Sequence, residues 1–213
     1  MADNRTVAVY CDFSAVSDEE LKDFEKLVAP HIPDYGKTRD ESLFARALLK
    51  YVLYKFFYVK DFTVLTSENG KPYLEGNNLY FNFSHCLKRV ICTVSDSEVG
   101  CDVQDIRPMN EKVTKRFFAS DEGLALSQSS KKDEHFTKLW TLKEAILKYK
   151  GEGISGGLDS YSFSDFLSYE GFCAYGLNFH SFEKDGFIYG ICSETKDINV
   201  FGADIKDILK NLM

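Results

Sequence analysis

A carboxylate and an ammonium group, Glu144 and Lys148, lie four residues apart in a stretch with helical periodicity, residues 136–150. At about 100° per residue, this spacing puts both side chains on one face of a helix, where they can contact each other. The large apolar residues of the stretch mostly cover a broad sector elsewhere on the helix: Phe136, Leu139, Leu142, Ile146, Leu147 and Tyr149. The pair therefore lies at the rim of a buried helix, either as a surface ion pair or as part of a site.

A second set of polar side chains comes from residues 99–108, where Asp102 and Gln104 alternate on a predicted strand. Alternate residues of a strand share a face, so these two point the same way and Asp105 points the opposite way. Together with Glu144 they form a set of oxygen ligands suited to Mg²⁺, which usually keeps positions for water and substrate phosphate. Considered alone, a strand aspartate is more often a capping or turn residue.

Two further stretches offer hydrogen-bond donors for phosphate. Lys71 stands in a predicted turn, between Gly70 and Pro72, and Ser84 and His85 open a segment that we expect to be irregular. Lysine, serine and histidine side chains can all donate to phosphate oxygens. Alone, however, a turn lysine is usually solvated and such a histidine usually has a structural role.

The composition is that of a globular protein: 213 residues, 44% hydrophobic and 28% charged, with a net charge of −7. An acidic chain argues against nucleic acid as the main partner, because phosphate contacts dominate that recognition. The six cysteines are scattered, without a zinc-ligand spacing. The sequence contains no apolar stretch typical of a signal peptide or membrane span. We therefore expect a reduced, cytoplasmic protein with no membrane partner.

The predicted elements mix helices with antiparallel strands along the whole chain. Residues 158–201 alternate aromatic and polar side chains, with a hairpin turn at residues 184–186. This order favours an α+β fold over a doubly wound sheet. The remaining elements are strands at residues 7–13, 62–66, 89–95 and 98–104, and helices at residues 17–28, 40–59, 111–118, 136–150 and 204–212.

In order and spacing, these stretches resemble the 4′-phosphopantetheinyl transferase superfamily from about residue 39 to residue 159. The closer resemblance is to the longer, single-chain, surfactin-synthetase-activating type, which serves peptide and polyketide synthases. Two motifs are specific, Gly-x-Asp-x-Gln at residues 100–104 and Trp-x-x-Lys-Glu-Ala-x-x-Lys at residues 140–148. Gly-Lys-Pro at residues 70–72 and Phe-Asn-x-Ser-His at residues 81–85 are weak alone.

The resemblance implies two similar α+β lobes in a pseudo-two-fold arrangement, with the active site at their interface. We expect the lobes to be residues 1–98 and 99–213, in a monomer. The activity implied is transfer of the phosphopantetheine group of coenzyme A to a serine of an acyl or peptidyl carrier protein, with release of 3′,5′-ADP. We expect no nucleic-acid partner.

The resemblance also implies roles for individual residues. Asp102, Gln104 and Glu144 would hold Mg²⁺, and Asp102, Glu144 and Lys148 would be the catalytic residues, with Lys148 on the pyrophosphate. Glu144 is the best placed acceptor for the serine proton, directly or through a metal-bound water. Coenzyme A would be bound by a larger set, namely Lys37, Arg39, Ser42, Arg46, Lys71, Pro72, Ser84, His85 and Lys148.

A carrier protein also needs a docking surface. Carrier proteins are typically acidic around the helix that follows their serine, so attraction to this acidic chain must be local. The segment after the Asp102 strand offers a basic surface, which we expect to border the metal site: Arg107, Lys112, Lys115 and Arg116. The alternative is a solvated face of a small helix.

Two features leave other functions open. Gln104 stands where the family usually has a second acid, which predicts weaker metal binding and allows a non-catalytic relative that binds coenzyme A or a carrier protein. Residues 155–160 spell the loop of ATP pyrophosphatases, but they follow a charged helix rather than a buried strand, so the context argues against adenylation. Lys143 falls in the apolar sector of its helix, and the sequence indicates no partner for it.

Overall fold

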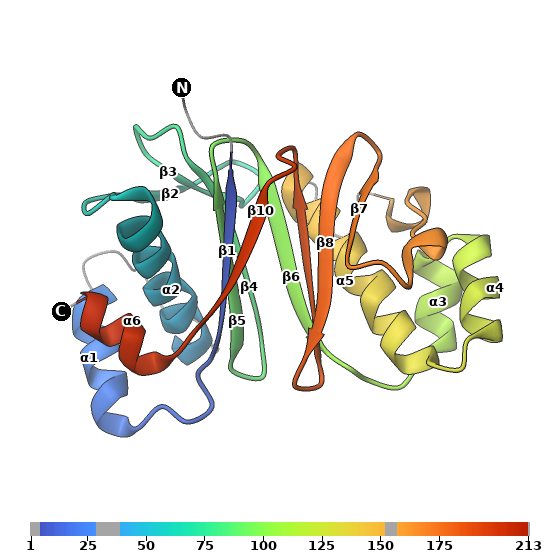
Figure 1. Ribbon diagram of the computed structural model, residues 1–213, viewed down its shortest axis with the longest axis horizontal. Helices are drawn as coiled ribbons and strands as arrows, with labels where there is room; N and C mark the ends of the chain where they lie inside the picture. Colours follow the sequence, from blue (N-terminus) through green and yellow to red (C-terminus); the bar gives the residue numbers. More distant parts are fainter. Residues whose placement is uncertain (1–4, 29–38, 152–156, 213) are drawn as a thin grey trace.

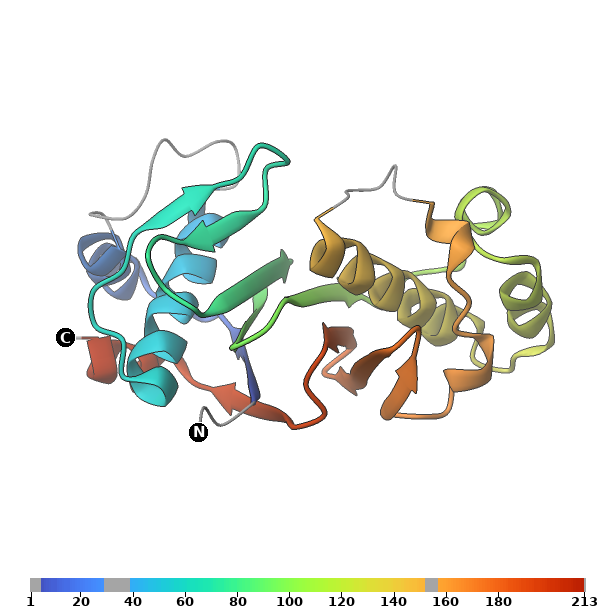
Figure 2. The ribbon, with the colours of Figure 1, turned by 90° about the horizontal axis from the view of Figure 1, so that it is seen from above.

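The computed structural model describes residues 5–28, 39–151 and 157–212. Two four-stranded sheets lie next to each other in the middle of the molecule, and helices cover the outer side of each sheet (Figures 1 and 2). Helices and antiparallel strands alternate in both halves, which confirms the expected α+β class. Within the described ranges, no helix is both long and apolar enough to cross a membrane.

The amino-terminal half is built around a sheet with the strand order β10-β1-β5-β4, and a separate hairpin pairs β2 with β3. Helix α2 packs against β4 and β5, and α1 packs against α2. The elements are β1 (Thr6–Asp12), α1 (Asp18–Val28), α2 (Arg39–Phe57), β2 (Val64–Thr66), β3 (Pro72–Leu74), β4 (Tyr80–Cys86) and β5 (Arg89–Ser95).

The carboxy-terminal half has an antiparallel sheet with the order β6-β9-β8-β7, and the long helix α5 lies across β6 and β9. Its elements are β6 (Val99–Asp105), α3 (Glu111–Phe117), α4 (Ser120–Gln128), α5 (Lys132–Lys150), two short 3₁₀ turns η2 (Leu158–Ser160) and η3 (Ser164–Phe166), β7 (Gly171–Ala174), β8 (Leu177–Lys184) and β9 (Phe187–Ser193).

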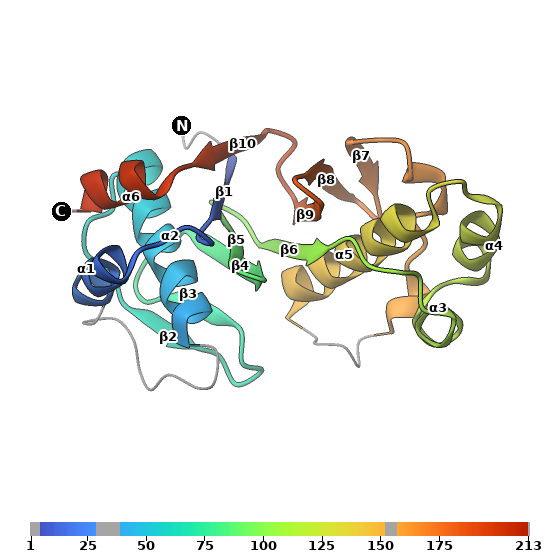
Figure 3. The same ribbon diagram turned by 90° about the horizontal axis from the view of Figure 1, so that it is seen from below.

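The last two elements return to the amino-terminal half (Figure 3). Strand β10 (Ile198–Ala203) pairs in parallel with β1, and α6 (Ile205–Leu212) packs against α2. The expected division at residues 98 and 99 therefore needs an amendment, because the chain after residue 99 does not stay in one half. Strand β10 covers an edge of β1 that would otherwise expose unpaired backbone groups.

Several elements differ from the sequence-based expectation, among them the short strand β3, which was not predicted. Ser84 and His85 belong to strand β4, not to an irregular segment, and Asn82 and Ser84 on the polar face of this strand are buried. Helix α4 was not expected because only Glu122 and Leu126 are buried along it. Helix α5 begins four residues earlier than expected, at Lys132, with acidic residues in its first turn.

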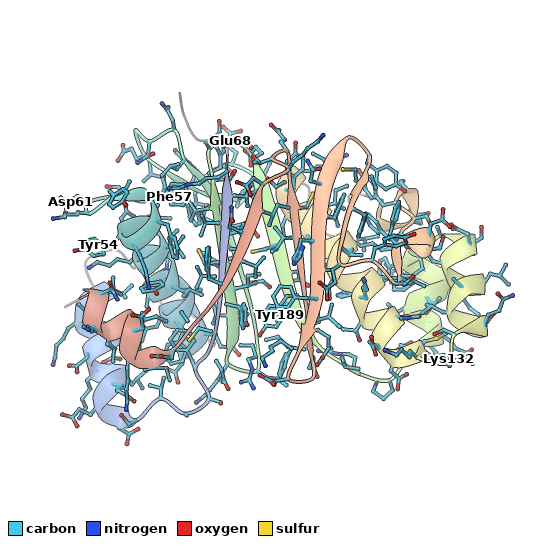
Figure 4. All side chains as sticks on the ribbon, in the orientation of Figure 1. Tyr54, Phe57, Asp61, Glu68, Lys132 and Tyr189 are labelled. Carbon is cyan, nitrogen blue, oxygen red and sulfur yellow. The ribbon has the colours of Figure 1, made fainter. Side chains whose placement is uncertain are left out.

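Buried apolar side chains form three clusters that match the layers. One lies between α2 and the first sheet, and a second between α5 and the other sheet. The third joins the two sheets and includes Ala8, Ile91, Val103 and Tyr189. Figure 4 shows Tyr189 in this central layer. The halves therefore share a core, so their relative position is fixed by packing.

Helix α5 lies unusually close to strand β6 at Gly100. A Cβ atom on Gly100 would be 2.1 Å from the carbonyl oxygen of Ala145 and 2.4 Å from the backbone nitrogen of Tyr149. Both are backbone atoms of the helix, so they cannot move aside as a flexible side chain could. A residue without a side chain is therefore required at position 100 for this packing.

We predict that Gly100→Ala lowers the melting temperature by roughly 5–10 °C, because overpacking costs about 1–3 kcal/mol or more. Gly123→Ala is the matched control, since its nearest contact would be at 3.9 Å and alanine is the better helix former. The control should melt at the wild-type temperature or slightly above it. Thermal unfolding monitored by circular dichroism measures both; wild-type stability of Gly100→Ala would contradict the close packing.

Candidate active site at the junction of the two halves

Edge strands of the two sheets, β4 and β6, lie side by side at the junction of the halves. The side-chain oxygen of Asn82 on β4 accepts a hydrogen bond from the backbone N–H of Cys101 on β6, at 3.1 Å. Strand β4 is therefore joined to β6 by a hydrogen bond to a buried side chain and not by backbone–backbone pairing. This contact places Ser84 on β4 beside Asp102 on β6.

Asp102 is the centre of a buried hydrogen-bonded group. Its Oδ1 accepts hydrogen bonds from Ser84 Oγ at 2.6 Å and from Lys148 Nζ at 2.6 Å, and Lys148 also donates to Ser84 at 2.9 Å. Only 1% of Asp102 is exposed. Burial lowers the pKa of Lys148, but the carboxylate of Asp102 outweighs this and raises the pKa above its usual value. Lys148 therefore stays cationic at neutral pH.

Glu144 is close to this group but differs from Asp102 in its surroundings. Its Oε1 is buried and accepts no hydrogen bond from any described residue. Burial raises the pKa of Glu144, and the charge of Asp102 raises it further, while Lys148 lowers it. Lys148 forms its ion pair with Asp102, so Glu144 and Lys148 do not make an i,i+4 surface ion pair with each other. Oε1 of Glu144 is therefore available to a proton or a cation.

Gln104 bridges Asp102 and Arg107. Its amide nitrogen donates to Asp102 Oδ2 at 3.0 Å, and its amide oxygen accepts from Arg107 at 3.4 Å. Arg107 is itself paired with Asp105. The amide oxygen is thus turned away from Asp102, and metal ligation through it requires the amide to turn over.

The donor set for a metal therefore consists of two carboxylates and one amide. Among the described residues, no group of three or more His, Cys, Asp or Glu side chains is arranged to hold a metal ion. The unpartnered oxygen of Glu144 facing the buried Asp102 nevertheless fits a hard cation such as Mg²⁺, which prefers oxygen ligands.

A pocket of about 300 Å³ lies between the β2–β3 hairpin and the end of α5. Lys71 and Pro72 line one wall, and Glu144 and Lys148 line the other. The ammonium group of Lys71 is already engaged, however: it donates to Glu98 and, at 2.7 Å, to the carbonyl oxygen of Tyr149 in the last turn of α5. Lys71 therefore holds the two halves together at this pocket, which the turn in the sequence did not indicate.

The other expected ligand residues lie around the start of α2. His85 is 3.1 Å from Glu41 in the first turn of this helix, which Arg39 begins. Ser42 is half-buried in the same turn region. Arg46 lines a different small pocket, with Phe62 and Val64, and is not among the residues that line the Lys71–Glu144 pocket. Lys37 lies outside the described residues.

The basic segment expected to dock a carrier protein follows β6 directly. Lys112, Lys115 and Arg116 are exposed on α3, and Arg107 is exposed before it. Next to them is a largely apolar pocket that sequence reasoning missed, because its walls come from separate elements. Gln104 connects this pocket to the Asp102 group. The pocket is lined by Gln104, Arg107, Pro108, Asn110, Val113, Phe136, Thr137 and Trp140.

Comparisons with known proteins agree with the geometry. The family model of the 4′-phosphopantetheinyl transferase superfamily matches residues 98–191, which include Asp102, Glu144 and Lys148. The 4′-phosphopantetheinyl transferase psf-1 of Bacillus pumilus is 32% identical over 152 residues, 68% of this chain and 65% of that protein. The 4′-phosphopantetheinyl transferase Sfp of Bacillus subtilis is 27% identical over 165 residues, 72% of this chain and 73% of that protein.

A putative 4′-phosphopantetheinyl transferase of Synechocystis is 40% identical over 98 residues, 42% of this chain and 40% of that protein. The chain thus spans about two thirds of the length of the two Bacillus relatives and less of the cyanobacterial one. On the family model and these relatives, the chain belongs to the 4′-phosphopantetheinyl transferase superfamily.

The raised pKa of Glu144 gives a prediction for stability. The folded state holds the Glu144 proton more tightly than the unfolded state, so ionised Glu144 costs stability above the folded pKa, and this cost disappears below about pH 4, where both states are protonated. Glu144→Gln should therefore melt higher than the wild type at pH 7–8 without Mg²⁺, and at the same temperature in acid.

Addition of Mg²⁺ tests the same carboxylate. A bound cation stabilises the folded protein, so it should raise the melting temperature of the wild type and not that of Glu144→Gln. Glu183→Gln, an exposed residue whose carboxylate accepts only from the Gly186 N–H at the β8–β9 turn, is the control and should resemble the wild type in both experiments. If the melting temperature of the wild type does not change when Mg²⁺ is added, the result would count against the metal site.

Proposed function

We propose that the protein transfers the 4′-phosphopantetheine group of coenzyme A to the serine hydroxyl of an acyl or peptidyl carrier protein and releases 3′,5′-ADP. One observation carries the proposal: Glu144 and Lys148 line a pocket whose other wall is formed by Lys71 and Pro72, and the buried Asp102 holds Lys148 there. The names of the relatives support the same activity, since each is called a 4′-phosphopantetheinyl transferase.

The chemistry needs charge neutralisation and alignment more than covalent help from the protein. In the transfer, the serine oxygen forms a bond to the β-phosphorus of coenzyme A, and the bond from that phosphorus to the 3′,5′-ADP oxygen breaks. Lys148 is a cation held beside the pocket by Asp102 and Ser84, where it can stabilise charge on the pyrophosphate. Glu144 can accept the serine proton, because its raised pKa makes it a stronger base than an ordinary carboxylate.

Magnesium completes this proposal. Asp102 and Glu144 are the residues that would hold the ion, and the unpartnered Oε1 of Glu144 supports this assignment. Gln104 is a third candidate ligand, either through its amide oxygen once the amide turns over or through a water. When bound, the ion would neutralise charge on the pyrophosphate.

Coenzyme A binding is proposed for the remaining residues with unequal support. Pro72 and Lys148 line the pocket, and Ser84 lies against Lys148. The engaged ammonium group of Lys71 supports a structural contribution more than a direct phosphate contact. The set still includes residues that the described contacts support less or leave open: His85, Arg39, Ser42, Arg46 and Lys37. A reducing, cytoplasmic setting is part of the proposal, and the six free cysteines support it.

A non-catalytic relative that binds coenzyme A or a carrier protein is the second candidate. The observation that favours it is the orientation of Gln104, which donates to Asp102 instead of offering it a second acidic oxygen. The two candidate functions differ in whether the protein transfers the phosphopantetheine group.

A transfer assay separates them. The wild type, incubated with coenzyme A, Mg²⁺ and several unmodified carrier proteins, should add the mass of phosphopantetheine, as measured by intact mass spectrometry. Asp102→Ala should remain folded and lose at least about 100-fold in rate, because it removes a metal ligand and the partner of Lys148. No transfer by the wild type at any Mg²⁺ concentration would favour the binding relative, and modification with ATP in place of coenzyme A would favour adenylation.

Carrier docking gives a second prediction. Lys112 and Lys115 are exposed, and Lys115 has only a distant partner, Glu111 at 3.8 Å. Changing both lysines to Glu should raise the KM for the carrier protein and flatten its salt dependence, because charge attraction is screened within about 10 Å at 0.1 M salt. The KM for coenzyme A should barely change.

The control carries the same change of charge on the far side of the molecule. Lys22 and Lys26 are exposed on α1, which lies at the opposite end from α3 (Figure 1). Changing both to Glu should leave both KM values as in the wild type. If the two double variants behave alike, net charge and not the α3 surface controls docking.

A further inference from the structure

Lys143 and Glu122 form an ion pair in the core of the carboxy-terminal half. Both side chains are 0% exposed, and Lys143 Nζ is 2.7 Å from Glu122 Oε2. Lys143 also donates to the carbonyl oxygens of Leu158, at 2.7 Å, and of Tyr161. The three donors of the ammonium group are therefore all used.

The carboxylate of Glu122 is satisfied in the same way. It accepts hydrogen bonds at 2.9 Å from the backbone N–H groups of Ala119 and Phe163 in addition to the bond with Lys143. The ring of Phe118 covers the ammonium group, with its centroid 5.5 Å from Nζ. The pair thus joins the start of α4, the middle of α5 and the segment from residue 158 to residue 163.

A fully buried ion pair is a poor way to stabilise a core. Burial lowers the pKa of Lys143 and raises that of Glu122, and the attraction between the two works against both shifts. Well-packed apolar side chains of similar volume are often as stabilising as such a pair, or more so. What an apolar pair cannot reproduce is the direction and length of five hydrogen bonds.

Those bonds fix the part of α5 that carries the site. Lys143 directly precedes Glu144, and Lys148 follows little more than one turn later. The opposite side of the helix rests on β6, where Gly100 leaves no spare room. Contact at Gly100 sets the distance between helix and strand. A contact at one point leaves the rotation of the helix about its axis open, and the directed hydrogen bonds of Lys143 constrain that rotation.

We propose that Lys143 and Glu122 are positioning residues for Glu144 and Lys148, and that they are required for catalysis more than for stability. The proposal rests on the transferase function. Neither residue is among those that line the pocket between Lys71 and Glu144. They act by holding α5 in the rotation that points Glu144 and Lys148 toward Asp102. A displacement of about 1 Å at a reacting group can cost about 100-fold in rate.

The test replaces both residues together, as Lys143→Met with Glu122→Met. We expect the melting temperature to change by only a few degrees, because no buried charge is left unpaired. The kcat should fall about 10- to 100-fold with little change in the KM for coenzyme A. Mg²⁺ affinity, measured by calorimetry in the presence of coenzyme A, should weaken as well, because Asp102 and Glu144 are no longer aligned. A role limited to stability predicts no change in kcat or in Mg²⁺ affinity.

Lys138→Met is the matched control. Lys138 is a second buried lysine of α5 that donates to backbone carbonyls, those of Leu167 and Tyr169, but it lies toward the helix start, away from Glu144. Its loss should lower the melting temperature and leave kcat and Mg²⁺ affinity unchanged. If the double variant does not fold, Glu122→Asp gives the second test, because it keeps the charge that Lys143 needs and shortens the side chain that holds it.

Two results would overturn the proposal. One is a folded double variant, or Glu122→Asp, with wild-type kcat and Mg²⁺ affinity. The other is an equal loss in Lys138→Met, which would mean that any perturbation of α5 has this effect. Failure of the transferase function is distinguishable from both, since the wild type would then transfer nothing. In that case the Mg²⁺ affinities of the variants still decide whether the pair positions the two carboxylates.

Discussion

The contact between α5 and β6 determines the geometry of the whole site. Gly100 admits the helix backbone, and Asp102, two residues along the strand, shares its face and meets the helix side chains. The glycine and the acid must therefore alternate on one strand, which gives a physical reason for the Gly-x-Asp spacing. A glycine on the neighbouring strand, Gly190, also lies close to Thr141 of α5, where a Cβ would be 3.0 Å from its methyl group and 3.2 Å from its carbonyl oxygen. The helix is held flat on two strands at once.

The two carboxylates of the site lie in different environments. Asp102 accepts hydrogen bonds from Ser84, Gln104 and Lys148, whereas Oε1 of Glu144 accepts none from the described residues. Such a difference separates two carboxylates into different roles, one occupied by hydrogen-bond donors and the other available to a proton or a metal ion. The separation arises from position, because Asp102 at the junction meets donors from both halves, Ser84 and Lys148, while Lys148 is turned to Asp102 and leaves Glu144 without it.

Features with a local sequence pattern could be predicted, and features that depend on contacts between distant segments could not. Helical periodicity was sufficient for α5 and for the placement of Glu144 and Lys148 together, and alternation was sufficient for Asp102 and Gln104 on β6. Strand β4 was missed because Asn82 and Ser84 are buried against the other half, which no local pattern records. The partners of Lys71 and Lys143 could not be predicted either, because Glu98, Tyr149 and Glu122 come close to these lysines only in the folded chain. Arg46 was expected by resemblance to bind coenzyme A together with Arg39 and Ser42 of the same helix, and that assignment stays a prediction.

The parallel pairing of β10 with β1 has a consequence for the order of events during synthesis. Thr6 pairs with Ile198 and Cys11 with Ala203, so β1 receives its second neighbour only after the chain has been made up to β10. Until then one edge of β1 is open, and the α2 surface that receives α6 is uncovered. The amino-terminal half therefore cannot complete its sheet as an independent early domain. The nascent chain must instead remain soluble with an incomplete sheet, which makes its exposure to other chains longest at the amino-terminal strand.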